Sequence, residues 1–172
     1  MYKLISYSDG SVLVTNDSPA YRAAHLVGSA EEAENLVVGL NQSGLMEQLA
    51  AHRFEFETSG LTLEGGMRLK TDRESQAQLS SAYTTLKYNL IPDTDWKALN
   101  GWQVVTLEQI EPIARAMAAH VRGCFRGERA VGTAITNATT MEQIESIDIP
   151  VQFNAAYEAA FAEVMAIEQA PE

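Results

Sequence analysis

The chain has 172 residues, and its 23 acidic residues outnumber the 12 lysines and arginines, which gives a formal charge of −11. A charge of that sign repels phosphate backbones, so we expect no nucleic-acid partner. The single cysteine, Cys124, excludes an internal disulfide and a multi-cysteine metal site. Because no apolar stretch approaches the roughly 18 residues that span a bilayer, we expect no membrane partner either.

The N-terminal segment begins with a predicted hairpin. Ser8-Asp9-Gly10 favours a tight turn between two short strands over residues 3–15, because Asp-Gly readily adopts the positive φ angles that such a turn needs. Ser18-Pro19 is typical of a helix start, with the serine as cap and the proline in the first turn. We expect this first helix to end at Gly28.

A second helix is predicted after Ser29, because apolar residues recur there at three- and four-residue steps as far as Leu49. Ser43-Gly44 interrupts the pattern, which leaves open whether the helix breaks at that point. The hairpin and the two helices together make residues 1–50 a candidate attachment module.

Polar and apolar side chains alternate along three short segments, residues 53–58, 61–64 and 67–70, which are separated by glycines. A period of two between glycine turns predicts a small antiparallel sheet with one face in water. We place this sheet in a core domain that covers residues 51–138.

Three further elements complete the core domain. An apolar stripe after Thr71 predicts a helix, and residues 96–105 predict another hairpin with Asn100-Gly101 as its turn. The longest helix is expected from Thr106 to about Arg129, since a single apolar stripe runs through it. Pro112 lies beyond its first turn, so we expect either a kink there or a later start.

The last segment, residues 139–172, contains no lysine or arginine and accumulates acidic residues. Asp148-Ile149-Pro150 predicts a break before a final helix over residues 154–167. Such charge usually forms a solvated helix face, and the alternative is an acidic docking surface for a basic partner.

Four sites match the capping box, in which a Ser or Thr and a Glu or Gln three residues later bind each other's backbone amides at a helix start. They are Ser29 with Glu32, Thr71 with Glu74, Thr106 with Gln109, and Thr140 with Gln143. Taken together, the elements predict an α+β fold in which helices cover one face of a small antiparallel sheet.

Residue pairs with metal-like or nucleophile-like spacing have simpler explanations. His120 and Cys124 lie four residues apart, but a structural zinc site needs four ligands and no nearby residue supplies the others. Cys124 falls on the apolar stripe of its helix, so we expect a core cysteine and not a nucleophile. Gly60 and Gly65-Gly66 lack the spacing and the terminal Lys-Ser or Lys-Thr of a phosphate-binding loop. We therefore expect no catalytic residue, no metal and no cofactor.

The acidic residues of the predicted strands are Glu55, Glu57 and Glu64. Alternation directs them toward solvent beside Arg53 and Arg68, where cross-strand ion pairs are expected. His25 and His52 are expected at the surface or at helix ends. The alternative is a small hydrolase that uses the carboxylates, and it requires a pocket in which one of them meets His52 with a shifted pKa.

Trp96 and Trp102 flank the predicted turn of the second hairpin. Either can pack in the core, but tryptophan is enriched at binding hot spots, so both are candidate partner-binding residues. A hairpin that presents them to a neighbouring protein is the binding hypothesis that the residues suggest.

Residues 53–135 resemble a family of phage and prophage proteins, classified as a domain of unknown function and often encoded beside tail-fibre genes. The stretches that carry the resemblance are residues 71–77, Trp96-Lys97, Gly101, Thr106-Leu107, Ile110, His120-Val121, Cys124-Phe125 and Glu128. The resemblance implies a non-enzymatic protein that binds a tail-fibre or baseplate protein, as a virion component or as an assembly factor that acts as a chaperone. It provides no catalytic residues to carry over.

The N-terminal residues indicate where the protein is expected. Because residues 1–6 show no apolar run of a secretion signal, we expect the protein in the host cytoplasm during assembly, and in the virion tail if it is retained. Self-association is left open. A third function class, an acidic regulator that imitates nucleic acid, requires the acidic residues after Thr139 to form one stripe, and their spacing scatters them.

Overall fold

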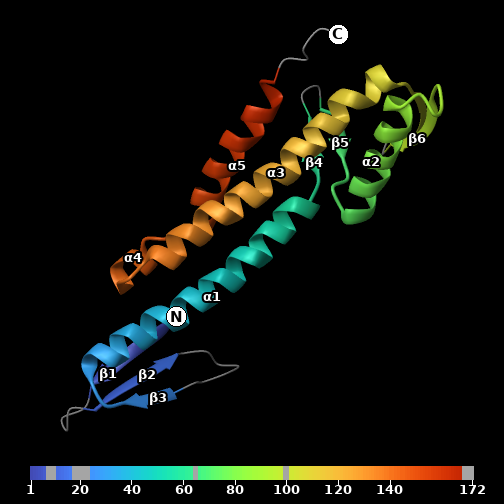
Figure 1. The fold of residues 1–172 in the computed structure, drawn as a ribbon. Coiled ribbons are helices and arrows are strands. Elements are labelled where there is room, and N and C mark those ends of the chain that lie inside the picture. Colours follow the sequence, from blue (N-terminus) through green and yellow to red (C-terminus); the bar gives the residue numbers. More distant parts are fainter. Residues whose placement is uncertain (7–10, 17–23, 64–65, 99–100, 168–172) are drawn as a thin grey trace. The chain divides into compact units, whose positions relative to one another are not determined.

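A computed structural model describes residues 1–6, 11–16, 24–63, 66–98 and 101–167, and the fold is α+β, as predicted (Figure 1). The described part contains helices and small antiparallel sheets. The strands are β1 (Tyr2–Ser6), β2 (Val12–Asn16), β3 (Ala24–Val27), β4 (Leu61–Thr62), β5 (Arg68–Leu69), β6 (Thr94–Ala98) and β7 (Gly101–Val105). The helices are α1 (Ala30–Thr58), α2 (Arg73–Lys87), α3 (Leu107–Asn137), α4 (Met141–Glu145) and α5 (Ile149–Met165).

The chain divides into two compact units. The first consists of residues 1–51 and 129–152, and the second consists of residues 52–128 and 153–172. Helices α1, α3 and α5 contribute residues to both units. Whether residues 1–50, 51–138 and 139–172 act as separate modules stays a prediction.

The first unit is built on a sheet in the order β1-β2-β3, with both pairs antiparallel. Val12 and Val14 of the central strand are buried, and they pack with Ala33 and Val37 of α1. This arrangement confirms the first hairpin, although its predicted turn at residues 8–10 lies outside the described residues. A sheet face covered by one helix stripe gives this unit an apolar core.

The helix expected between Ser18 and Gly28 is wrong for its last part, because residues 24–27 form strand β3. The start at Ser18-Pro19 lies outside the described residues. Pairing explains the difference: β2 has a second edge, and Val27 lies opposite Val12 in the register. A tertiary partner of this kind overrides local helix signals.

Helix α1 is continuous through Ser43-Gly44, so the helix does not break at the point that the sequence left open. The strand predicted over residues 53–58 is also wrong, because these residues are the last turns of the same helix. The buried positions of α1 recur every four residues, and they are Ala33, Val37, Asn41, Leu45, Leu49 and Glu57. A stripe with that period fits a helix, and the alternating letters of residues 53–58 lie at its end.

The second unit contains the two hairpins predicted there, although Gly65 and Asn100 of the predicted turns lie outside the described residues. β4 pairs with β5 and β6 pairs with β7, both antiparallel. Gly60 has a φ of +106°, and a Cβ there would lie 3.2 Å from the Leu69 carbonyl oxygen, so this turn requires glycine. Leu79 and Leu86 of α2 share a core with Ile110 and Met117 of α3, and Figure 1 shows the two helices side by side.

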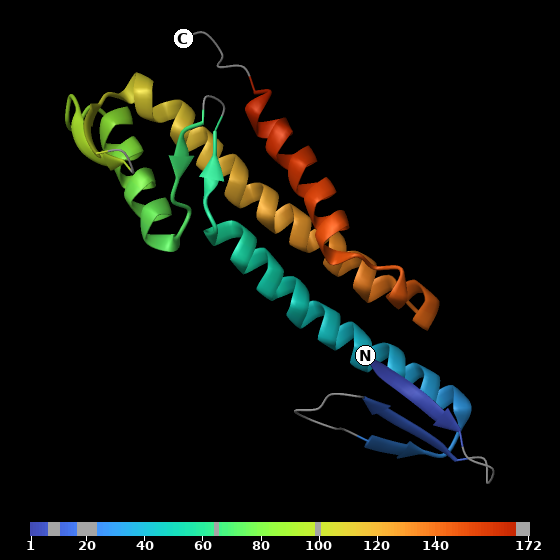
Figure 2. The same ribbon diagram turned by 180° about the vertical axis from the view of Figure 1, so that it is seen from behind.

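Helix α3 confirms the predicted long helix and extends it to Asn137. The buried residues Val131 and Ile135 continue its apolar stripe, which explains the extra turns. Pro112 lies inside the helix and α3 begins at Leu107, so the later start is wrong. Figures 1 and 2 both show α5 alongside α3, and the two helices touch where Tyr157 approaches Gly123.

The final helix begins earlier than expected. Asp148 Oδ1 accepts a hydrogen bond from the Val151 amide at 3.1 Å, so this aspartate caps α5, and Pro150 lies in the first turn. The short helix α4 precedes it and has Thr140 as its N-cap, where the predicted capping box with Gln143 is confirmed. None of the helices in the described ranges combines the length and apolarity needed to cross a membrane.

The remaining capping boxes are formed in part or displaced. The Ser29 hydroxyl accepts from the Glu32 amide at 3.2 Å, and the Gln109 side chain accepts from the Thr106 amide at 3.0 Å. The box predicted at Thr71 is wrong, because Asp72 is the cap of α2 and accepts from the Ser75 amide at 2.9 Å. This hydrogen bond lowers the pKa of Asp72.

Candidate functional site

The two tryptophans of the second hairpin lie on opposite faces of it. Trp96 is opposite Gln103 in the register and Trp102 is opposite Lys97, and neighbouring register pairs point to opposite sides of a sheet. Trp96 packs against the core between α2 and α3, whereas Trp102 is 69% exposed. The Lys97 ammonium lies 5.5 Å from the centre of the Trp102 ring.

The outward face of this hairpin carries a second large apolar side chain. Val104 follows Trp102 by two residues, lies on the same face and is also exposed. Just before β6, three more apolar residues are exposed, namely Tyr88, Leu90 and Ile91. The described residues between Tyr88 and Val104 therefore combine an antiparallel strand pair with exposed apolar side chains, and whether they bind another protein stays a prediction.

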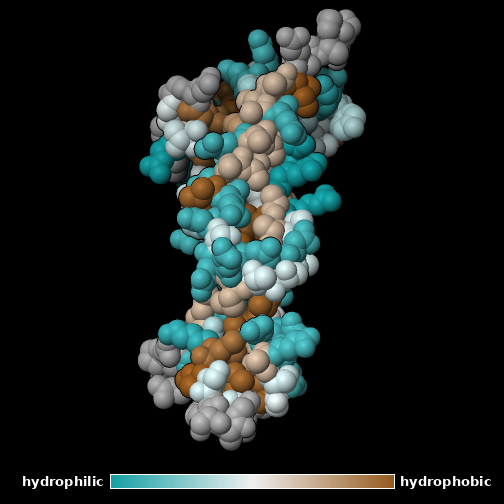
Figure 3. Space-filling model, turned by 90° about the vertical axis from the view of Figure 1, so that its left-hand side faces the viewer, coloured by the Kyte–Doolittle hydropathy of each residue, from teal (hydrophilic) through white to brown (hydrophobic). Residues whose placement is uncertain are grey.

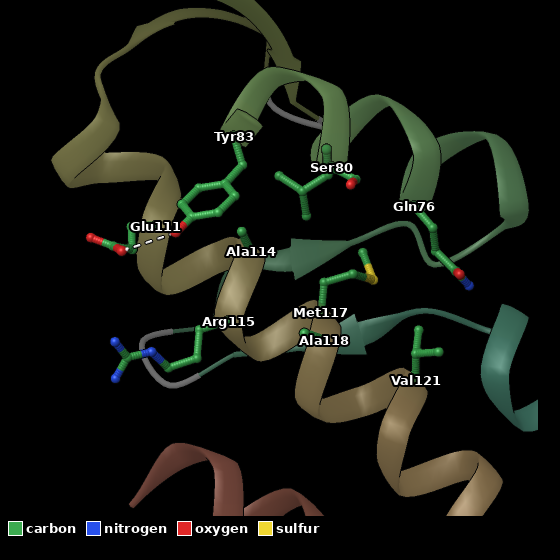
Figure 4. A pocket seen from close by; sticks show the side chains of 10 residues that line it. Gln76, Ser80, Tyr83, Glu111, Ala114, Arg115, Met117, Ala118 and Val121 are labelled. Carbon is green, nitrogen blue, oxygen red and sulfur yellow. Dashed lines mark hydrogen bonds between the residues drawn. The ribbon is translucent and has the colours of Figure 1, made fainter. Parts of the chain in front are cut away.

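A groove of about 510 Å³ lies between α2 and α3 in the same unit (Figure 4). Leu79, Met117 and Val121 supply apolar lining. Tyr83 donates a hydrogen bond to Glu111 at 3.2 Å. Burial is the main cause that raises the pKa of Tyr83, and the hydrogen bond to the Glu111 carboxylate is the second cause. Arg115, which also lines the groove, donates to the carbonyl oxygen of Ile167 at 2.8 Å. The charged groups of the groove thus bind other parts of the chain.

Glu57 is the centre of a buried polar network at the end of α1. Its side chain is fully buried, and it accepts from Arg53 Nη1 at 2.7 Å and from Gln76 Nε2 at 3.2 Å. Arg73 Nη2 approaches the same carboxylate at 3.3 Å, and Arg53 also donates to Glu128 at 3.2 Å. The network joins α1, α2 and α3, so its evident role is to hold these helices together.

This position corrects the expectation that the acidic residues face solvent on strands. Glu55 is exposed on α1, Glu57 is buried, and Glu64 lies outside the described residues. The groove is lined by neither Glu55 nor Glu57, and His52 does not line it either. This groove is therefore not the pocket that the hydrolase alternative requires, and that alternative stays a prediction.

His120 is buried beside this network, and its two ring nitrogens have different partners. Nε2 lies 3.0 Å from the Glu57 carbonyl oxygen, which can only accept, so Nε2 carries the proton. Nδ1 then accepts from the Tyr157 hydroxyl at 2.9 Å. Burial lowers the pKa of His120 and raises the pKa of Tyr157 to about 12, so both groups are neutral at pH 7.

Cys124 is buried one helical turn beyond His120, as the sequence predicted. Its sulfur lies 3.9 Å from His120 Nε2, which carries a proton and already donates to a carbonyl oxygen. Burial raises the pKa of the Cys124 thiol to about 12. The pair therefore lacks both a free base and a thiolate, which a cysteine nucleophile needs.

The surface position expected for His25 is confirmed, since it is exposed on β3, but His52 lies inside α1 and is half-buried. The His52 ring packs edge-on against Phe153 with the ring centres 4.9 Å apart, and its Nε2 is buried without a hydrogen-bond partner in the described structure. Phe56, Phe153, Tyr157 and His120 form one aromatic cluster. Within the described ranges, no three side chains of His, Cys, Asp or Glu gather as metal ligands.

The acidic residues after Thr139 occupy several elements. Glu142 and Glu145 belong to α4, Asp148 caps α5, and Glu163 of α5 forms an ion pair with Arg122 at 2.7 Å. A hydrogen bond from Arg122 lowers the pKa of Glu163. Glu168 and Glu172 lie outside the described residues.

Sequence reasoning missed the buried network, although one signal for it was present. Arg53 and Glu57 have the i,i+4 spacing of an ion pair on a helix, but the alternating letters around them favoured a strand. Tyr157 and His120 lie 37 residues apart in sequence, so no local pattern pairs them.

Comparison with known families gives one match. The model of a family described as "Domain of unknown function (DUF4376)" matches residues 41–151. This span contains residues 53–135, which carry the resemblance noted in the sequence, and it leaves the first 40 residues outside. No curated protein and no solved structure matched the chain.

Proposed function

Since the chain belongs to the DUF4376 family, we propose that it shares the role implied by the tail-associated resemblance of residues 53–135. It is then a non-enzymatic bacteriophage protein that binds a tail-fibre or baseplate protein. The observation that supports this proposal best is the outward face of the β6–β7 hairpin, where Trp102 is 69% exposed and Val104 lies beside it.

An exposed tryptophan on a rigid strand pair is well suited to protein binding. The ring removes a large apolar area from water when a partner covers it, and the hairpin fixes its position before binding. Lys97, which lies over the ring, adds a donor at the rim of the same face. We therefore assign Trp102 to partner contact and Trp96 to positioning the hairpin from the core side.

The buried polar groups support a structural role for the interior. Glu57 binds Arg53, Arg73 and Gln76, and His120 binds a hydroxyl and a carbonyl oxygen. Glu57 and His120 are thus engaged with their neighbours, whereas His52 Nε2 is buried without a hydrogen-bond partner in the described structure. We therefore assign the contact with another protein to the exposed hairpin face and not to Glu57 or His120.

Co-purification tests the proposal. The tagged protein is expressed with each tail-fibre and baseplate protein encoded in the same phage or prophage, and the mass of any complex is measured by native mass spectrometry. We expect a stable complex with at least one of them. Absence of a complex with all of them would contradict the proposal.

Two variants locate the surface. Trp102→Ala is expected to weaken the complex by about 2 kcal/mol or more, as hot-spot aromatics do. Phe54→Ala is the matched control, because Phe54 is an exposed aromatic on α1 in the same unit, and it is expected to bind like the unchanged protein. Equal weakening of the complex by both variants would contradict the assignment of the hairpin as the binding surface. It would not contradict the binding of a tail protein itself.

Purified particles distinguish the two modes of action. A virion component is expected in mature tails at a fixed ratio to the fibre protein, whereas an assembly factor, such as a fibre chaperone, is expected only in lysates of the host cytoplasm. Mass spectrometry of both fractions measures this difference.

A further inference from the structure

Strand β1 has one edge that no strand of the described chain covers. It pairs with β2 on its other side and ends the sheet order β1-β2-β3 (Figures 1 and 2). At its first residue, the Tyr2 amide donates to Asn41 Oδ1 at 2.8 Å, and Asn41 Nδ2 donates to the Tyr2 carbonyl oxygen at 3.2 Å. The buried amide of Asn41 therefore takes the place of a neighbouring strand, but only at Tyr2.

These two hydrogen bonds fix the direction of the other backbone groups of β1. In an antiparallel pair, residues alternate between those bonded to the partner strand and those whose N–H and C=O point away from it. The groups of Tyr2 point away from β2, toward Asn41, so those of Leu4 and Ser6 point the same way. Leu4 and Ser6 thus present two donors and two acceptors on the edge beyond Asn41.

Two side chains beside these groups are apolar and exposed. Leu4 is 38% exposed and Ile5 is 46% exposed. Figure 3 shows hydrophobic surface at the lower end of the view, where the sheet of the first unit lies. Natural edge strands are commonly protected by charge, proline or a bulge; β1 carries one charge, Lys3, but neither a proline nor a bulge, and its exposed backbone groups can template another strand.

We propose that β1 pairs antiparallel with β1 of a second copy of this chain, about a two-fold axis at Ile5. Leu4 of each copy then exchanges both backbone hydrogen bonds with Ser6 of the other. The partial positive charge of each N–H faces the partial negative charge of a C=O, so this edge is electrostatically complementary to itself.

The Asn41 amide selects this register. A pairing centred on Leu4 would need the backbone groups of Tyr2, which Asn41 already binds. A pairing centred on Ile5 leaves Asn41 in place and sets Ile5 opposite Ile5 of the copy, which is a favourable β-branched cross-strand pair. It also extends the apolar row formed by Ile5 and Leu13, which are opposite each other in the register.

The affinity of such a contact is modest. A pair of five-residue strands buries far less than the roughly 1,200 Å² of a standard stable interface, so the dimer forms at high local concentration. The paired strand lies outside the family match, which begins at Asn41, and the pairing does not depend on the tail partner.

Cross-linking at the axis tests the proposal. Ile5 would form a pair without backbone hydrogen bonds, whose Cα atoms lie about 4.5 Å apart, and that separation suits a disulfide. Ile5→Cys is expected to give a disulfide-linked dimer under mild oxidation. Leu13→Cys is the matched control, since it lies on the same face one strand further in, and it is expected to stay monomeric. The buried Cys124 thiol takes no part.

A proline at the edge checks the backbone contacts. Leu4→Pro removes an N–H that points away from β2, so the hairpin keeps its hydrogen bonds. In the Ile5→Cys background we expect it to reduce dimer yield about tenfold, because each dimer loses two hydrogen bonds. The circular dichroism spectrum shows whether the sheet is intact. Equal cross-linking of Ile5→Cys and Leu13→Cys, or undiminished cross-linking of a folded proline variant, would overturn the proposal.

Discussion

The interiors of the two units are built from different chemistry. In the first unit, the core around Val12, Val14 and Val37 is apolar, and its buried polar residue, Asn41, carries no charge. In the second unit, the buried groups include a carboxylate, Glu57, and an imidazole, His120. Two units of one chain therefore reach stability with different sensitivity to charge and pH.

The difference teaches how each interior fixes its structure. Apolar packing tolerates exchange between residues of similar size, because dispersion and burial have little directional preference. A buried carboxylate accepts only donors in certain places, so Glu57 determines where Arg53, Arg73 and Gln76 lie. We expect the second unit to be the more specifically ordered of the two and the more vulnerable to loss of one polar partner.

The largest expected effect is loss of the Glu57 carboxylate. Glu57→Ala leaves the guanidinium of Arg53, which is 15% exposed, with Glu128 as its remaining partner. Removing one member of a buried ion pair typically costs about 3 kcal/mol, and we expect a loss of that size in the free energy of unfolding. Urea denaturation followed by circular dichroism measures it.

The neighbouring carboxylate provides the control. Glu55 lies two residues away on the same helix and is exposed, so Glu55→Ala should change the free energy of unfolding by no more than about 0.5 kcal/mol. Similar losses for the two variants would mean that Glu57 does not organise the second unit.

The sequence predicted elements whose signals are local. Local signals predicted the pairing of β1 with β2, the pairing of β6 with β7, the long helix α3 and the box at Thr140, and all of these elements are present. The α+β class follows from them. Cys124 could be assigned to the core because its helix stripe is visible in the sequence.

The sequence failed where a distant partner decides the structure. Residues 53–58 alternate like a strand, but the hydrogen bonds of Glu57 come from residues as far away as Gln76. Ala24–Val27 became a strand because β2 offered an edge. Trp96 lies against the core and Trp102 is exposed, and this difference follows from the register of the hairpin. Composition does not contain the register, so the sequence could not separate the two. A partner-binding role for either tryptophan stays a prediction.

Substitution of a glycine by alanine in each unit is expected to change stability by an intermediate amount, with opposite sign in the two units. At Gly127 in the second unit, an added Cβ would lie 2.8 Å from the Phe153 ring and 3.0 Å from its carbonyl oxygen. We expect Gly127→Ala to destabilise the protein by about 1–3 kcal/mol, because neither ring nor backbone can move freely. At Gly44 in the first unit, nothing lies within 4 Å of the added Cβ.

Gly44→Ala should therefore stabilise α1 by about 0.5–1 kcal/mol, which is the helix propensity difference. Thermal melting of both variants against the unchanged protein measures the two signs. A loss of stability for Gly44→Ala would mean that Ser43-Gly44 does interrupt the helix, against the continuous α1 described above.

The smallest expected effect is the pH dependence that His120 gives to the second unit. Burial holds its pKa below the ordinary value of 6.5, so the unfolded chain binds a proton more readily than the folded one. The stability that depends on neutral His120 is complete above pH 6.5 and is lost as the pH falls below that value, by at most about 1.4 kcal/mol per pH unit. Protonation would place a charge next to the Glu57 carbonyl oxygen, the Tyr157 hydroxyl and the Cys124 sulfur.

His120→Gln isolates this contribution, since glutamine keeps a donor and an acceptor but does not titrate in this range. Urea midpoints measured between pH 7.5 and 5 should fall less steeply for His120→Gln than for the unchanged protein. An equally steep fall for His120→Gln and for the unchanged protein would mean that this imidazole does not give the second unit its pH dependence. The contrast between an apolar and a polar interior would then not extend to pH.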